Sequence, residues 1–187
     1  MKPYDQNIVT FDAMFTGYMQ AATRFHDAAA GRDAAAAFIP LFEALNWAAT
    51  LDWRIGAHWT PDGGESLGGG WPERMGNADL VYGVRFVRNS AHHQWSDALG
   101  LAEGRRYPRR YPSVYFEWVW RPVSELPPPE KRRKNDERGE AVYRAQLEGH
   151  AARHTLEELS VIFETMRGWL EPWLLRRQLE PAVVTTE

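Results

Sequence analysis

The sequence predicts an all-α protein, a four-helix up-and-down bundle with a small irregular or β insertion between the third and last helices. Four long segments carry apolar residues at three- and four-residue steps, the spacing that gathers side chains on one face of a helix. Segments rich in glycine, proline or charge separate them, and one aromatic, β-branched stretch departs from the pattern. Helices joined in this order favour antiparallel packing.

The first two helices are expected over residues 8–30 and 33–55. Gly31 offers a C-terminal stop for the first, and Pro40 suggests that the second begins near Ile39, with the proline in its first turn. The expected buried stripe of the first helix is Phe11, Met14, Phe15, Tyr18, Met19, Ala22 and Phe25. That of the second is Phe38, Leu41, Phe42, Leu45, Ala48, Ala49 and Leu51.

The third helix is expected over residues 78–99, after a glycine-rich loop at 56–72. Its inward residues would be Leu80, Val84, Val87, Ala91 and Trp95. Residues 114–120 are β-branched and aromatic, which predicts one short strand or extended segment.

A proline run followed by charged residues then predicts an exposed linker at 127–138. The last helix is expected over residues 139–175, interrupted near its end by Pro172. Its expected buried face is Tyr143, Leu147, Leu156, Leu159, Ile162, Phe163, Met166 and Leu170.

The length and composition indicate one domain spanning residues 1–187. An insertion and exposed linker would occupy 104–138, and 180–187 would form a disordered tail. The chain has 44% hydrophobic residues and nine Trp, which suffice for a substantial core. Its net charge is -3, so any contact with RNA must rely on a local basic patch.

The absence of cysteine excludes disulfides, thiolate metal sites and Cys nucleophiles. No signal peptide is expected, because the N-terminus lacks the basic-then-apolar pattern. No apolar run is expected to approach the roughly 20 residues that cross a bilayer. We therefore expect a cytoplasmic protein that contacts no membrane.

The segment Arg88-Asn89-Ser90-Ala91-His92-His93 carries the residues best suited to chemistry. At helical spacing Arg88 and His92 share one side, as do Asn89 and His93. A histidine can take the proton from a ribose 2′-OH, whose oxygen then attacks the adjacent phosphate, and an arginine can hold the developing charge. The expected products are a cyclic phosphate and a 5′-hydroxyl, with no cofactor required.

Arg88 and Asn89, followed by three residues and then His93, resemble the motif of the HEPN (higher eukaryotes and prokaryotes nucleotide-binding) family. The ribonucleases of that family are helical bundles that share an Arg, four to six residues, and then a His. The resemblance implies metal-independent RNA cleavage by a homodimer in which two motifs face one cleft. It also implies a toxin–antitoxin or phage-defence role, with an antitoxin or defence-system partner.

Two alternatives within the motif stay open. Arg85 with His92 also satisfies the loosest form of the family spacing, and His92 could replace His93 as the partner of Arg88. We favour Arg88 with His93 because only that pair has the Asn in place. An ordinary polar helix face would account for the same residues without any catalysis, which leaves a non-catalytic HEPN-like module binding nucleic acid or protein as the second hypothesis.

A basic and aromatic stretch follows the third helix. Its cations are interleaved with Tyr107 and Tyr111, a combination typical of single-strand binding, although tyrosines packed at a bundle end explain it equally well. The candidate substrate-binding residues are Arg105, Arg106, Arg109 and Arg110.

A third hypothesis is a metal site. His150 and His154 would project from one face of the last helix, and His58 or His26 could complete a three-His site. That arrangement looks like the DinB-like metal-dependent four-helix bundles.

Polar residues of the second helix are candidates for orienting the motif. Glu43, Asn46 and Asp52 lie among apolar neighbours there. Glu43 or Asp52 could pair with Arg85 or Arg88, as an orienting contact or as a structural ion pair between packed helices.

Overall fold

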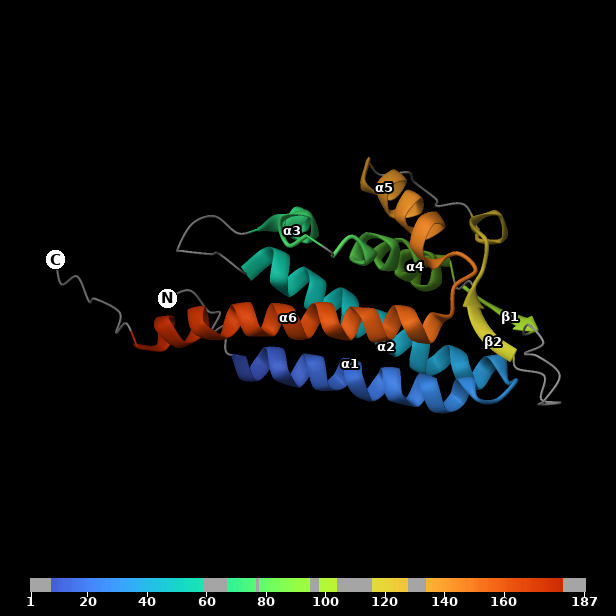
Figure 1. Cartoon of the computed structure of the whole chain (residues 1–187), viewed down its shortest axis with the longest axis horizontal. Helices are drawn as coiled ribbons and strands as arrows, with labels where there is room; N and C mark the ends of the chain where they lie inside the picture. The colour runs from blue at the N-terminus through green and yellow to red at the C-terminus, as the bar shows by residue number, and fades with distance from the viewer. Residues whose placement is uncertain are drawn as a thin grey trace, which may run out of the picture.

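The structure, a computed structural model, describes residues 8–58, 67–76, 78–94, 98–103, 116–127 and 134–179. Within these residues the chain forms six α-helices and a two-stranded antiparallel sheet at one end (Figure 1). The elements are α1 (Ile8–Ala29), α2 (Ala34–His58), η2 (Gly68–Gly70), α3 (Trp71–Arg74), α4 (Leu80–Gln94), β1 (Leu99–Glu103), β2 (Phe116–Trp120), η3 (Val123–Glu125), α5 (Lys134–Val142), η4 (Tyr143–Leu147) and α6 (Ala152–Leu179).

The longest helices lie along one another. α1 packs against α2 and α6, and α2 packs against α4. In Figure 1, α1 and α4 run from left to right, whereas α2 and α6 run from right to left. The expectation of a mostly helical chain with a small β insertion is confirmed, and the four-helix bundle stays a prediction.

The start of α2 shows why Pro40 does not begin the helix. The Asp33 carboxylate accepts hydrogen bonds from the backbone N–H groups of Ala35 (2.9 Å) and Ala36 (3.3 Å), which caps the helix at Ala34. Pro40 therefore lies inside α2, and the predicted start near Ile39 is wrong. The turn before it forms as expected, because Gly31 follows the end of α1.

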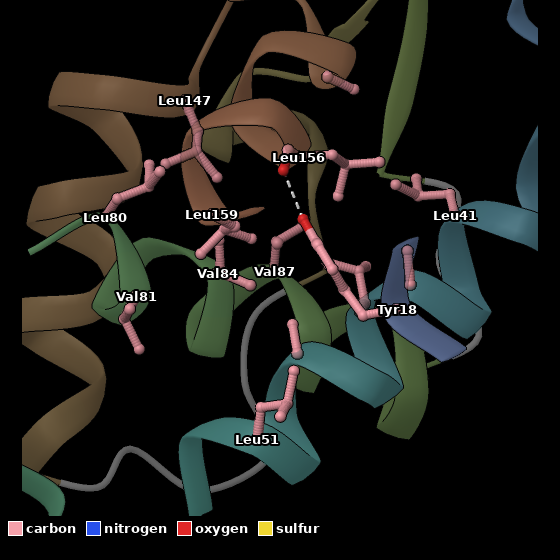
Figure 2. Packing of buried hydrophobic residues seen from close by; sticks show 14 of the residues in the cluster. Tyr18, Leu41, Leu51, Leu80, Val81, Val84, Val87, Leu147, Leu156 and Leu159 are labelled. Atoms are coloured by element: carbon pink, nitrogen blue, oxygen red, sulfur yellow. Dashed lines mark hydrogen bonds between the residues drawn. The ribbon is translucent and has the colours of Figure 1, made fainter. Parts of the chain in front are cut away.

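Tyr18 lies at the centre of the core, fully buried among apolar side chains from α2, α4 and α6 (Figure 2). Its hydroxyl donates a hydrogen bond to the Leu156 carbonyl at 2.5 Å. Burial raises the pKa of Tyr18, so the phenol stays neutral and remains a donor. Met19, which was predicted to be buried with it, is 40% exposed.

A β-hairpin follows α4, where the third helix was predicted to continue. α4 ends at Gln94, and β1 pairs with β2 from Leu99 opposite Trp120 to Glu103 opposite Phe116. The extended segment predicted within 114–120 is confirmed for β2. β1 was missed because Leu-Gly-Leu-Ala-Glu has little strand propensity of its own and becomes a strand through its partner.

Two tryptophans of β2 connect the hairpin to the helical part of the protein through hydrogen bonds. The indole N–H of Trp118 donates to the Gly31 carbonyl (3.2 Å), in the turn between α1 and α2. The indole N–H of Trp120 donates to the Thr155 hydroxyl (2.8 Å), in the first turn of α6.

The predicted last helix, 139–175, is wrong as one continuous element. α5 begins at Lys134, inside the expected linker, and passes into η4, a single π-helical turn. Gly149 then adopts φ +73°, and its N–H donates to the Trp120 carbonyl (2.9 Å), so the chain pairs with β2 before α6 begins. Pro172 does not interrupt α6, which continues to Leu179.

Helix α2 has the length and composition of a membrane-spanning helix, although no such segment was expected from the sequence. The segment Ala34–Ala57 of α2 is long and apolar enough to cross a membrane by length and composition, with a mean hydropathy of 1.3. Its many alanines raise the mean although polar residues interrupt every apolar run. Core helices pass the same test, and Leu41, Leu45 and Leu51 place one face of α2 in the core.

Substitution by alanine should change the free energy of unfolding in opposite directions at Gly83 and at Gly168. A Cβ at Gly83 would lie 2.7 Å from the Leu147 side chain and 3.2 Å from the Tyr143 nitrogen, whereas a Cβ at Gly168 meets nothing within 4 Å. We expect Gly83→Ala to lower the free energy of unfolding by about 1–3 kcal/mol, because α4 and η4 must separate. Gly168→Ala should raise it by up to about 1 kcal/mol. Urea denaturation measures both, and equal effects would contradict the close packing of α4 on η4.

Candidate functional site

The motif lies on α4, which separates its polar residues from the core. Val84, Val87 and Ser90 are buried, whereas Arg88 is half-buried and Asn89 is exposed. The apolar side of α4 faces α2 and α6, and η4 packs closely at Gly83. The remaining face therefore presents Arg88 and Asn89 to solvent.

Asp52 of α2 holds the first arginine of this face. Arg85 donates to both carboxylate oxygens of Asp52, at 2.6 Å through Nε and at 2.5 Å through Nη2. The indole N–H of Trp71 donates to the same carboxylate at 2.7 Å, and Arg85 Nη1 donates to the Gly69 carbonyl at 2.8 Å. Arg85 thus joins α4 to α2 and to the turn that precedes α3.

The surroundings of Arg85 keep it charged. Burial disfavours the guanidinium ion, but the hydrogen bonds and negative charge of Asp52 outweigh that cost and raise the pKa of Arg85 above its ordinary value. The ring of Tyr82 adds a cation–π contact at 4.8 Å, and Arg138 of α5 lies 4.1 Å from the same ring. These contacts give Arg85 a structural role.

Arg88 is held far more loosely, one turn further along α4. Its Nε lies 3.4 Å from Asn46 Oδ1 of α2, and its Nη1 lies 3.4 Å from Asn89 Oδ1. The Asn46 amide in turn donates to the Phe42 carbonyl at 2.9 Å, which orients its oxygen toward Arg88. Since both contacts of Arg88 with described side chains are long, its guanidinium can turn toward an anion at little cost.

The backbone of His92 and His93 is part of α4, but their side chains lie outside the described residues. α4 is one continuous helix through Gln94. At about 100° per residue, His92 is therefore about 40° from Arg88 around the helix axis, and His93 about 140°. The backbone places His92 on the same face as Arg88 and His93 on a different one.

The candidate substrate-binding arginines and one histidine of the metal alternative are not among the described side chains. Arg105, Arg106, Arg109 and Arg110 lie outside the described residues, as does the side chain of His58.

The expected metal-binding pair is not on one helix. His150 lies in the turn before α6, where its Nδ1 is 2.8 Å from the Gln146 carbonyl, and His154 lies in the first turn of α6. Among the side chains that the structure describes, no three His, Asp or Glu converge as metal ligands.

Sequence reasoning identified only part of the second helix's role. Asp52 pairs with Arg85, as one of its alternatives proposed, whereas Glu43 forms its ion pair with Arg24 of α1. Asn46 was noted, but not as a partner of Arg88. Trp53, 59% exposed beside Asp52, was missed altogether, because tryptophans in an apolar-rich sequence were assigned to the core.

Comparison with known proteins finds no relative of this chain, since no protein-family model, curated protein or solved structure matches it. The case for a function therefore rests on the residues of α2 and α4.

Asp52→Asn should destabilise the fold strongly. The amide can still accept from Trp71, but the Arg85 cation loses its counter-charge in a site where Asp52 is only 11% exposed. We expect the free energy of unfolding to fall by about 3 kcal/mol. Adding Arg85→Met should recover part of that loss, because it removes the unpaired charge.

The matched control is Glu43→Gln, which removes an ion pair whose side chains are 56% and 39% exposed. It should cost less than about 0.5 kcal/mol. Urea denaturation of the four proteins makes the comparison. A loss in Asp52→Asn no larger than the loss in Glu43→Gln would show that the Asp52–Arg85 pair does not hold α2 to α4.

Proposed function

We propose that the chain is a metal-independent endoribonuclease of the HEPN type, with Arg88, Asn89 and His93 as its catalytic residues. The observation that carries this proposal is the contrast between the two arginines of α4. Asp52 engages Arg85 in the fold, whereas Arg88 faces solvent with two long contacts to amide oxygens. A loosely held cation beside an exposed Asn is suited to bind a phosphate.

The scaffold of the proposal is a four-helix up-and-down bundle made of α1, α2, α4 and α6. The alternating directions of these helices in Figure 1 and the packing of α1 on α2 and α6 support it. In such a bundle α4 would lie beside α2 along its length, with its polar face outward.

The reaction needs one proton acceptor and one stabilising cation. The imidazole of His93 takes the proton of a ribose 2′-OH, and the 2′ oxygen attacks the adjacent phosphorus. The bond from phosphorus to the 5′ oxygen breaks, and that oxygen takes up a proton from water and leaves as a 5′-hydroxyl, while the imidazolium returns its proton to the solvent. Arg88 binds the charge that develops on the phosphoryl oxygens, and the other product is a 2′,3′-cyclic phosphate.

A homodimer solves the geometric problem of the motif. Since His93 lies about 140° around α4 from Arg88, one protomer cannot easily direct both groups at one phosphate. In a dimer whose α4 helices face each other, Arg88 of one protomer meets the histidine of its partner. His92, on the same face as Arg88, is the alternative base within one protomer.

Such an activity would suit a cytoplasmic toxin or phage-defence enzyme that a partner holds inactive. An unrestrained ribonuclease should be toxic when the chain is expressed alone, and an antitoxin or defence-system partner would then relieve it. Tight binding of nucleic acid or protein without cleavage would instead favour the non-catalytic module.

Cleavage of RNA should persist in the presence of EDTA and should fall sharply when the motif is substituted. We expect Arg88→Gln to lower kcat by about 100-fold, because it removes the charge that stabilises the phosphorane-like transition state. His93→Gln should lower kcat by at least as much, because it removes the proton acceptor. The measurement is the rate at which fluorescent RNA yields ends with a cyclic phosphate.

Two controls sharpen that experiment. Arg24→Gln removes an exposed cation on α1 and should leave the rate unchanged. His92→Gln separates the two histidines: if it abolishes cleavage while His93→Gln does not, the base is His92. Full activity in Arg88→Gln would mean that the site is assigned wrongly.

Mixing two inactive variants tests whether the site is shared between protomers. If Arg88 of one protomer acts with His93 of the other, each heterodimer of Arg88→Gln with His93→Gln should regain one of its two sites, about half of the activity of an unsubstituted dimer. A site built within one protomer recovers nothing at all. Subunit exchange is verified by mass photometry of protomers that differ in size, so that failure to mix is not mistaken for failure to complement.

A further inference from the structure

Trp53 lies exposed on α2 at the same end as the Asp52–Arg85 pair. Its side chain is 59% exposed, although tryptophan offers one of the largest apolar surfaces to bury. The guanidinium of Arg54 lies 5.5 Å from the centre of its ring. A single exposed tryptophan is common on protein surfaces, so its neighbourhood decides what it means.

The residues that share its face of α2 are polar or small. Thr50 and Ala57 are exposed, and Asn46, about two turns before Trp53, is half-buried and contacts Arg88. A protein-docking patch is centred on clustered apolar side chains within a polar rim. In the part of the chain that the structure describes, this face has instead an aromatic ring with the Arg54 guanidinium over it.

The cations near Trp53 belong to two helices. Arg54 lies over its ring, and Arg88 lies at the far end of the same face, against Asn46. The Asp52 carboxylate next to Trp53 is neutralised by Arg85. An approaching polyanion therefore meets a tryptophan and cations, the combination that binds single-stranded nucleic acid by stacking bases and holding phosphates.

This end of α2 is bordered by a turn of three glycines, which carry no side chains. The turn Gly68–Gly70 lies against it, since a Cβ at Gly56 would be 2.7 Å from the Gly68 carbonyl oxygen. No described atom lies within 4 Å of a Cβ built at Gly69 or Gly70. Among the described residues, Gly69 and Gly70 thus present only backbone beside Arg85.

We propose that Trp53 stacks on a base of a single-stranded RNA whose phosphate binds Arg88. This inference rests on the proposed ribonuclease function and adds its substrate class, unpaired RNA. Asn46 and Trp53 are seven positions apart, about 10 Å along the helix, so a nucleotide neighbouring the bound phosphate can reach the ring. A duplex cannot offer its base faces in this way, because they are already stacked.

Binding of a non-cleavable RNA tests the proposal directly. The probe is a short fluorescein-labelled oligouridine with methylated 2′-hydroxyls, which cannot undergo 2′-OH attack, and fluorescence anisotropy gives its Kd. Trp53→Ala should raise Kd about tenfold, and Trp53→Phe, which keeps an aromatic face, by threefold or less. Trp169→Ala removes a tryptophan of matched exposure (57%) from α6 and should leave Kd unchanged.

Removal of single bases from the probe identifies the partner of the ring. One abasic position should weaken binding to the unsubstituted protein about as much as Trp53→Ala does, and the same position should cost nothing further in Trp53→Ala. A Kd of Trp53→Ala equal to that of the unsubstituted protein overturns the proposal. So does an abasic scan without such a position, or no binding of the probe by the unsubstituted protein.

Two further measurements separate the possible failures. If Trp53→Ala converts a dimer to a monomer in sedimentation and leaves the Kd of the probe unchanged, the face is a protein interface and the stacking role is wrong. If the probe binds through Trp53 but ordinary RNA is never cleaved, the stacking role stands and the nuclease fails. Cleavage that proceeds equally well in Trp53→Ala, with unchanged Kd, leaves the nuclease and removes the stacking role.

Discussion

The arrangement of α2 and α4 depends on the hydrogen bonds that the Asp52 carboxylate accepts. It accepts hydrogen bonds from Arg85 and from Trp71, and Arg85 also reaches the Gly69 carbonyl. A charge so little exposed is tolerated only with a partner of matching geometry, and a bidentate guanidinium provides that. The pair therefore specifies the position of α4 along α2 more than it adds net stability.

The position of α4 along α2 determines which side chain Arg88 contacts, one turn after Arg85. With Arg85 opposite Asp52, Arg88 lies opposite Asn46, and the antiparallel helices repeat a polar contact in a weaker form. On the other side of α4, Gly83 admits Leu147 and Tyr143 of η4 at close range. α4 is thus held on two sides, and the face left over carries Arg88 and Asn89.

Periodicity predicted the main helices because each buries one face along most of its length. Periodicity did not predict the local structure where pairing with a segment distant in the sequence determines it. β1 exists because β2 pairs with it, and the break before α6 exists because Gly149 and His150 pair with Trp120. Within the site, Asp52 could be predicted as a partner because a carboxylate among apolar residues needs a cation. The looser Asn46–Arg88 contact and the exposure of Trp53 depend on helix rotation, which composition does not reveal.

The same rotation limits how the motif can work. Two residues five apart on a continuous helix point in different directions, and no repacking of α4 changes that unless the helix itself breaks. In the proposed ribonuclease, either His92 would act with the Arg88 of its own chain, or His93 would act with the Arg88 of another. Asp52 and η4 both hold α4 in place, which favours the proposal that two copies share the surface around Arg88. In the proposed dimer, the pairing of arginine and histidine would be a property of the assembly, since one helix supplies only one half of each pair.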